Sequence, residues 1–134
     1  MNMKKVLFIG LAGGVLLWFY NFLMHGIIMA DTYTGNAVFK QEASNPLWFL
    51  LVEFCMATAG AMIFVKTRNA WADGPKGGAT FGLFVGLLTF FAQFIEPLVI
   101  SGFPYYLAWC WGGISLIGWV IYGGLAGTMY KQGA

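Results

Sequence analysis

Charged residues are scarce in this chain of 134 residues: they make up 9% of it, while 60% of the residues are hydrophobic. Soluble domains carry roughly 25% charged residues, so this chain lacks the polar surface that water requires. The shortage excludes a soluble enzyme, a nucleic-acid-binding module and a disordered chain, and the net charge of +2 is too small to indicate an acidic partner. Only two cysteines are present, Cys55 and Cys110, each inside an apolar run, which excludes a disulfide framework and a zinc-finger spacing.

Long apolar runs are the main feature of the chain. Four of them reach the length of about 20 residues that a helix needs to cross a bilayer, and they cover residues 6–29, 47–65, 79–101 and 105–130. We therefore predict a single all-α domain over residues 1–134, a polytopic membrane protein with a bundle of four transmembrane helices. The short Gly102-Phe103-Pro104 turn joins the last two spans as an antiparallel hairpin, and the glycine-rich Gly74–Gly78 segment is predicted to form a turn.

Basic residues gather on one side of the predicted bundle. That side holds both termini and the loop between the second and third spans, and it carries Lys4, Lys5, Lys66, Arg68, Lys76 and Lys131. The opposite side carries only Lys40. Because lysine and arginine are enriched in cytoplasmic loops, we expect the N and C termini to be cytoplasmic.

Glycine is abundant, with 19 residues, and several of them recur at helical spacing. Three pairs are separated by three residues, Gly10 with Gly14, Gly82 with Gly86, and Gly123 with Gly127. Small residues at this spacing let two helices approach closely in lipid, where apolar burial alone drives little association. We expect these glycines to lie where helices pack.

Polar side chains interrupt the predicted spans at a few positions. His25, Glu53 and Glu96 lie in the same half of the bundle, and Asn21 and Gln93 share the helix faces of His25 and Glu96, respectively. A charged group at the centre of a membrane helix costs about 2.5–3.5 kcal/mol on insertion scales, so each of these residues needs a partner or a role. We expect the five residues to form one polar cluster that either binds a ligand or joins the helices by hydrogen bonds.

Several chemistries fit this cluster. His25, Glu53 and Glu96 are candidate ligands of a divalent metal, since imidazole and carboxylate are usual metal ligands. A carboxyl group in apolar surroundings could instead carry a proton for a coupled transporter. A quinone, a lipid or a tetrapyrrole could also bind here, although the sequence requires no cofactor. Pro97 removes a backbone donor and frees the carbonyl group of Gln93, which predicts a kink in the third span.

Three sequence elements resemble those of a group of small bacterial four-helix integral membrane proteins. They are Asn21-Phe22-Leu23-Met24-His25-Gly26 at the end of the first span, Gly77-Gly78 with Gly82 and Gly86 at the start of the third, and Met129-Tyr130-Lys131 after a glycine-rich last span. The resemblance covers the layout of most of the chain. It implies a multi-pass protein of the bacterial inner membrane, and it brings no activity with it.

The predicted loops are too short to form a soluble catalytic domain, and the sequence contains no complete catalytic constellation. We therefore expect a protein that is not an enzyme: an accessory or scaffold subunit of a larger membrane complex, such as a respiratory or photosynthetic one. Its partners would be other membrane subunits and lipids, with no nucleic acid. The alternative is a small homo-oligomeric bundle, either a proton-coupled transporter or a binder of a small hydrophobic ligand, metal or tetrapyrrole, that uses His25, Glu53 and Glu96.

Overall fold

The computed structural model describes residues 1–131, which are mostly helical and contain no strand. Helix α1 (Met3–Asn21) continues directly into a π-helix, η1 (Phe22–Ile28), and the short α2 (Ala30–Thr34) follows. Helix α3 (Pro46–Lys66) leads through the 3-10 turn η2 (Arg68–Ala70) to α4 (Gly74–Ala92). A second 3-10 turn, η3 (Gln93–Ile95), α5 (Glu96–Val99) and α6 (Tyr105–Met129) complete the described chain.

Four helical segments are long and apolar enough to cross a membrane. They are Met3–Ile28, Pro46–Lys66, Gly74–Val99 and Tyr105–Met129. In the most apolar stretch of each segment at most 44% of the residues are buried inside the molecule, so many apolar side chains face outward. The prediction of an all-α chain with four such helices is confirmed, and it indicates a multi-pass membrane protein.

The third of these segments begins at Gly74 rather than near residue 79, so the predicted Gly74–Gly78 turn is wrong. Gly74 has a φ of +80°, a conformation that glycine adopts without steric cost. Pro75 then occupies the first turn of α4, where its missing N–H breaks no helical hydrogen bond. The Gly-Pro sequence therefore starts a helix here, although the same pair often marks a turn.

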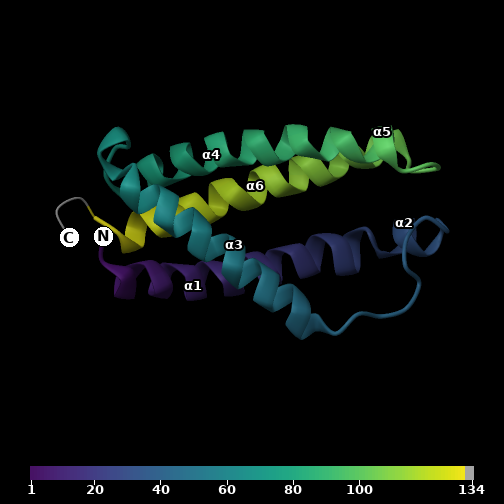
Figure 1. Ribbon diagram of the computed structural model, residues 1–134, viewed down its shortest axis with the longest axis horizontal. Coiled ribbons are helices and arrows are strands. Elements are labelled where there is room, and N and C mark those ends of the chain that lie inside the picture. Colours follow the sequence, from purple (N-terminus) through teal and green to yellow (C-terminus); the bar gives the residue numbers. More distant parts are fainter. Residues whose placement is uncertain (132–134) are drawn as a thin grey trace.

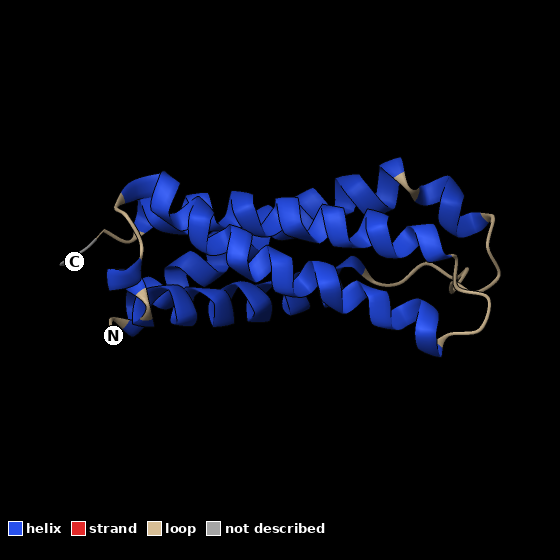
Figure 2. Cartoon of the chain, turned by 90° about the horizontal axis from the view of Figure 1, so that it is seen from above, coloured by secondary structure: helices blue, strands red, loops and turns tan. Residues whose placement is uncertain are grey.

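The four long helices form two closely packed antiparallel pairs, α1 with α3 and α4 with α6 (Figure 1). Contacts between α1 and α6 join the two pairs. The start of α1, the end of α6 and the α3–α4 connection lie at one end of the molecule, which we call the terminal end (Figures 1 and 2). Helix α2, residues 35–45 and the turn at residues 100–104 lie at the other end, the loop end.

Glycines on α1 set its close approach to α3. A Cβ atom added to Gly10 would lie 2.2 Å from the Thr58 hydroxyl oxygen, and one added to Gly14 would lie 2.8 Å from the Cα of Phe54. Real Cβ atoms do not come this near to other heavy atoms. The first predicted glycine pair therefore lies directly at the α1–α3 contact.

The other two glycine pairs lie at the contact between α4 and α6. A Cβ atom on Gly82 would lie 2.0 Å from a carbonyl oxygen of α6, and one on Gly123 would lie 2.1 Å from the carbonyl oxygen of Gly78. Gly86 and Gly127 face backbone atoms of the opposite helix in the same way. At these positions any side chain would push the two backbones apart.

The buried core that connects the two pairs is built around Tyr122 of α6. Its side chain is fully buried, and its ring packs against Gly13 of α1 and Gly60 of α3. Its hydroxyl donates to the carbonyl oxygen of Ala57 at 2.5 Å. One α6 side chain thus contacts both helices of the other pair.

Arg68 links the α3–α4 connection to the end of α6 at the terminal end. Its side chain is buried, with only 4% of the residue exposed. Its guanidinium donates to the carbonyl oxygens of Trp71 and Tyr130 at 2.8 and 3.2 Å, donates more weakly to that of Ala72, and pairs with Asp73. The sequence places Arg68 in a loop, but the structure shows a buried group that connects the α3–α4 connection to the end of α6.

A candidate ligand cavity at the loop end

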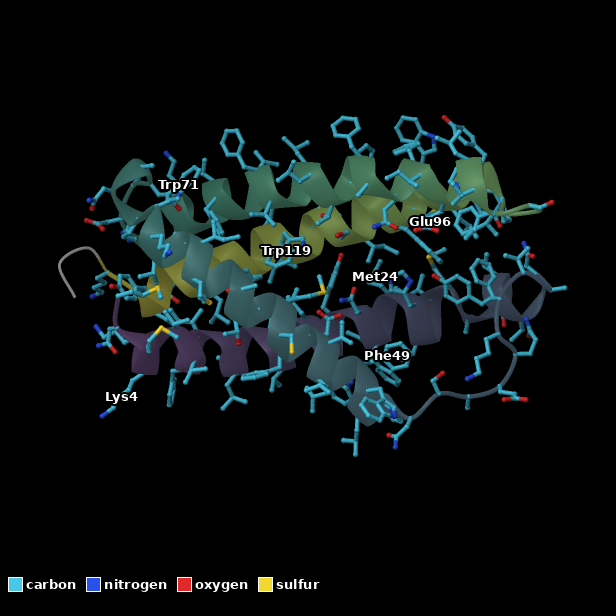
Figure 3. All side chains as sticks on the ribbon, viewed as in Figure 1. Lys4, Met24, Phe49, Trp71, Glu96 and Trp119 are labelled. Atoms are coloured by element: carbon cyan, nitrogen blue, oxygen red, sulfur yellow. The ribbon has the colours of Figure 1, made fainter. Side chains whose placement is uncertain are left out.

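A cavity of about 720 Å³ lies at the loop end between the two helix pairs. Small-molecule sites in proteins range from about 300 to 1,000 Å³, so this cavity is large enough for a small organic ligand. Its wall comes from α1, η1, α2, α3, η3, α6 and the segment between α2 and α3. Figure 3 shows two of the lining residues, Phe49 of α3 and Trp119 of α6. The aromatic residues of the wall are Trp18, Phe22, Tyr33, Phe39, Phe49, Trp111 and Trp119.

Asn21 and Glu53 meet in the wall of this cavity. Asn21 is the last residue of α1, and its Nδ2 donates to Oε1 of Glu53 in α3 at 2.6 Å. The second carboxyl oxygen, Oε2, is buried and has no hydrogen-bond partner among the described residues. Within residues 1–131 the one ion pair is Arg68–Asp73 at the terminal end. No described lysine, arginine or histidine therefore lies within ion-pair distance of the Glu53 carboxyl group.

His25 lies in the π-helix η1, beside Tyr33 and Trp111. Its Nδ1 is 2.5 Å from the Tyr33 hydroxyl oxygen, and Nε1 of Trp111 donates to the same oxygen at 2.8 Å. Burial raises the pKa of Tyr33, so its hydroxyl stays protonated at neutral pH. The Tyr33 hydroxyl can then donate a hydrogen bond to Nδ1 of His25. A neutral His25 that accepts at Nδ1 carries its own proton on Nε2, which is left as a donor.

The π-helical turn that carries His25 is visible in its backbone hydrogen bonds. The Met29 N–H donates to the Met24 carbonyl oxygen at 3.0 Å, which is the i to i−5 spacing of a π-helix.

A 3-10 turn interrupts the third span directly before Pro97 and separates Gln93 from Glu96. The Gln93 carbonyl group, which the sequence predicts to be free, accepts from the Glu96 N–H instead, so this part of the prediction is wrong. Helix α4 ends at Ala92, and three 3-10 residues follow before α5 begins at Glu96. A 3-10 turn advances about 120° per residue instead of 100°, so residues beyond it are rotated by roughly 60° from the continuous α-helix that the sequence pattern assumes. Gln93 lines the cavity and Glu96 does not. Of the five predicted cluster residues, the cavity wall brings together Asn21, His25, Glu53 and Gln93.

Aromatic side chains pack against one another at the loop end of the cavity, and the sequence does not predict this cluster. The Phe39 ring packs against the rings of Tyr33, Trp111 and Phe103, with centroid distances of 4.9, 5.7 and 5.9 Å. The Gln41 side chain donates to the carbonyl oxygens of Tyr33 and Phe39 at 3.1 and 2.9 Å. These hydrogen bonds hold the backbone of residues 33–41 in place. Tyr33 and Phe39 are the two aromatic residues of the mostly polar loop between the first two spans, and they were the sequence signal for this aromatic cluster.

No group of three or more His, Cys, Asp or Glu side chains within residues 1–131 is placed to hold a metal ion. The interpretation of His25, Glu53 and Glu96 as metal ligands therefore gains no support. What the cavity wall offers is the carboxyl groups of Glu53 and Glu42, the ammonium group of Lys40, the imidazole of His25, two amides and a large aromatic surface.

No family model, curated protein or solved structure matches this chain. The resemblance to small bacterial membrane proteins therefore stays a prediction, and the cavity itself is the basis for assigning a function.

Proposed function

We propose that this multi-pass membrane protein binds a small amphipathic molecule in the cavity at its loop end, and that it does so without catalysing a reaction. The observation that carries the proposal is the composition of the cavity wall. Ligand sites combine a mainly apolar and aromatic wall with a few polar groups that fix the orientation of the ligand. This wall has seven aromatic residues among its 20 members, together with the side chains of Asn21, His25, Glu53 and Gln93.

Unused hydrogen-bonding capacity in the wall supports the proposal. Oε2 of Glu53 is buried without a partner, and the Gln93 side chain makes no hydrogen bond within the described residues. Polar groups inside membrane-spanning segments are expensive unless something satisfies them, and they commonly mark binding sites or pathways. A bound ligand with a hydrogen-bonding group would satisfy the Gln93 side chain, which lines the cavity and which the described protein leaves open.

The distribution of basic residues supports an orientation for the site. The start of α1, the end of α6 and the α3–α4 connection lie at one end of the molecule (Figure 1). Most of the lysines belong to these parts of the sequence or directly adjoin them. With the terminal end in the cytoplasm of a bacterial cell, the cavity would face the outer side of the inner membrane. The ligand would then reach the cavity from outside the cytoplasm or from the outer leaflet. Membership in a larger membrane complex, or assembly with further copies of this chain, stays a prediction.

Filling the cavity is expected to abolish binding. Met56 and Met62 both lie on α3 and have similar exposures of 39% and 36%, but only Met56 lines the cavity. The indole ring of a Met56→Trp variant would occupy part of the volume that the ligand needs. We expect this change to weaken binding of a neutral probe, triphenylphosphine oxide, by about tenfold or more, which corresponds to about 1.4 kcal/mol. Native mass spectrometry of the protein in lipid nanodiscs measures the bound fraction.

The Met62→Trp variant is the matched control, because it adds the same indole to the same helix outside the cavity. It should bind the probe with an affinity within about twofold of the unchanged protein. Equal weakening of probe binding by the two variants would contradict the proposed function.

A further inference from the structure

We infer that the ligand of this cavity is a hydrophobic organic cation with a single positive charge, an inference that rests on the proposed function. The charge of the wall is the first reason. Glu53 is the one carboxyl group that the membrane-spanning segments contribute to the wall, and those segments contribute no lysine or arginine to it. Lys40 and Glu42 also line the cavity, but both are exposed residues of the loop. Their charges have opposite signs, so together they add no net charge to the wall.

The environment of Glu53 makes an added positive charge favourable. Its Oε1 is held by Asn21, and its Oε2 is buried without a partner. An ionised carboxylate in a medium of low dielectric constant is strongly unfavourable without an opposite charge nearby. His25 is the other ionisable residue that the membrane-spanning segments contribute to the wall. Its Nδ1 is hydrogen-bonded to Tyr33 and not to Glu53. A cation in the cavity would supply a positive charge that no described residue places within ion-pair distance of Glu53.

The aromatic wall suits an organic cation better than a metal ion. Indole faces attract cations, and the attraction strengthens when the cation leaves water. Trp18, Trp111 and Trp119 all line the cavity. A metal ion would need several oxygen or nitrogen ligands converging on one point, and the described residues offer no group of three. A cation that carries apolar substituents needs only one counter-charge and a large apolar surface.

The test compares two probes that differ in charge but hardly in shape. Methyltriphenylphosphonium carries one positive charge, and triphenylphosphine oxide has an oxygen in place of the methyl group and is neutral. We expect the unchanged protein in nanodiscs to bind the cation about tenfold or more tightly than the neutral probe. Glu53→Gln keeps the side-chain shape and removes the charge, so it should reduce that ratio of affinities to about one. Size-exclusion chromatography shows that the variant is folded.

Glu96→Gln is the matched control. It removes a carboxyl group at the same end of the molecule that does not line the cavity, so the ratio of affinities should not change. If both probes bind the unchanged protein equally, or if Glu53→Gln leaves the ratio unchanged, the cation inference is wrong while the binding function stands. If neither probe binds, the proposed function fails as well.

Discussion

Gly123→Ala is expected to destabilise the protein more than any other single methyl group added to α6. The new Cβ would lie 2.1 Å from the Gly78 carbonyl oxygen and 2.9 Å from the Gly82 Cα. Both obstacles are backbone atoms of α4, so no side-chain rotation can relieve the clash. Overpacking of this kind costs about 1–3 kcal/mol, and we expect the upper end of this range here. The free energy of unfolding, measured by titration with sodium dodecyl sulfate in mixed micelles, would show the loss.

Gly124→Ala provides the control at the neighbouring position. The nearest atom to its added Cβ would be the Pro75 carbonyl oxygen at 3.9 Å, which is ordinary contact. Alanine also favours the helix over glycine by up to about 1 kcal/mol in water, so this change should be neutral or slightly stabilising. Equal destabilisation by the two substitutions would contradict the close backbone contact between α4 and α6.

Arg68→Ala is expected to have the second large effect. The substitution leaves the carbonyl oxygens of Trp71, Ala72 and Tyr130 without the donor that they now share. A buried polar group that loses its partner costs about 1–3 kcal/mol, so the loss of several bonds together should reach about 3 kcal/mol. Hydrogen exchange of the α3–α4 connection and of the end of α6 should speed up in the variant.

Arg68→Lys separates the charge of the side chain from its shape. Lysine keeps the positive charge beside Asp73 but replaces the planar fork of donors with one compact ammonium group. We expect it to recover less than half of the stability that Arg68→Ala loses. Full recovery would show that the charge alone matters at this position and would contradict the role given to the carbonyl contacts.

The sequence predicts the helices and much of their packing, because both depend on local patterns. Apolar length defines the four spans, and glycines at a spacing of four residues lie where helices approach closely. Position 74 shows where local rules fail. Glycine and proline were interpreted as a turn, while the structure uses the positive φ of Gly74 and the fixed φ of Pro75 to start α4.

The site is only partly predictable, because it depends on how helices rotate and on what the loops cover. Asn21 and Glu53 could be placed at similar depths from the sequence, but their hydrogen bond depends on how α1 and α3 are rotated toward each other. Glu96 departs from the predicted face because η3 changes the turn angle before it. Tyr33 and Trp111 are 78 positions apart in the sequence, and nothing local predicts that they share a hydrogen bond.

Close helix packing and irregular helical structure lie at opposite ends of the described chain. Glycine contacts, the Tyr122 core and the Arg68 contacts hold the helices together over the terminal half of the bundle. The loop end instead contains the π-helix, a break in the third span and a cavity with unsatisfied polar groups. Irregular helical turns of this kind often occur at functional sites.

The most direct test of the proposed site is the response of the six tryptophan indole groups to a bound probe. Trp18, Trp111 and Trp119 line the cavity, whereas Trp48, Trp71 and Trp109 do not, and Figure 3 shows Trp71 at the terminal end. In an NMR titration of the ¹⁵N-labelled protein with triphenylphosphine oxide, the indole signals of the first three should shift and saturate, while that of Trp71 stays in place. Shifts confined to the exposed Trp48 and Trp109 would show that the probe only partitions into the surrounding detergent, and would contradict a ligand site in the cavity.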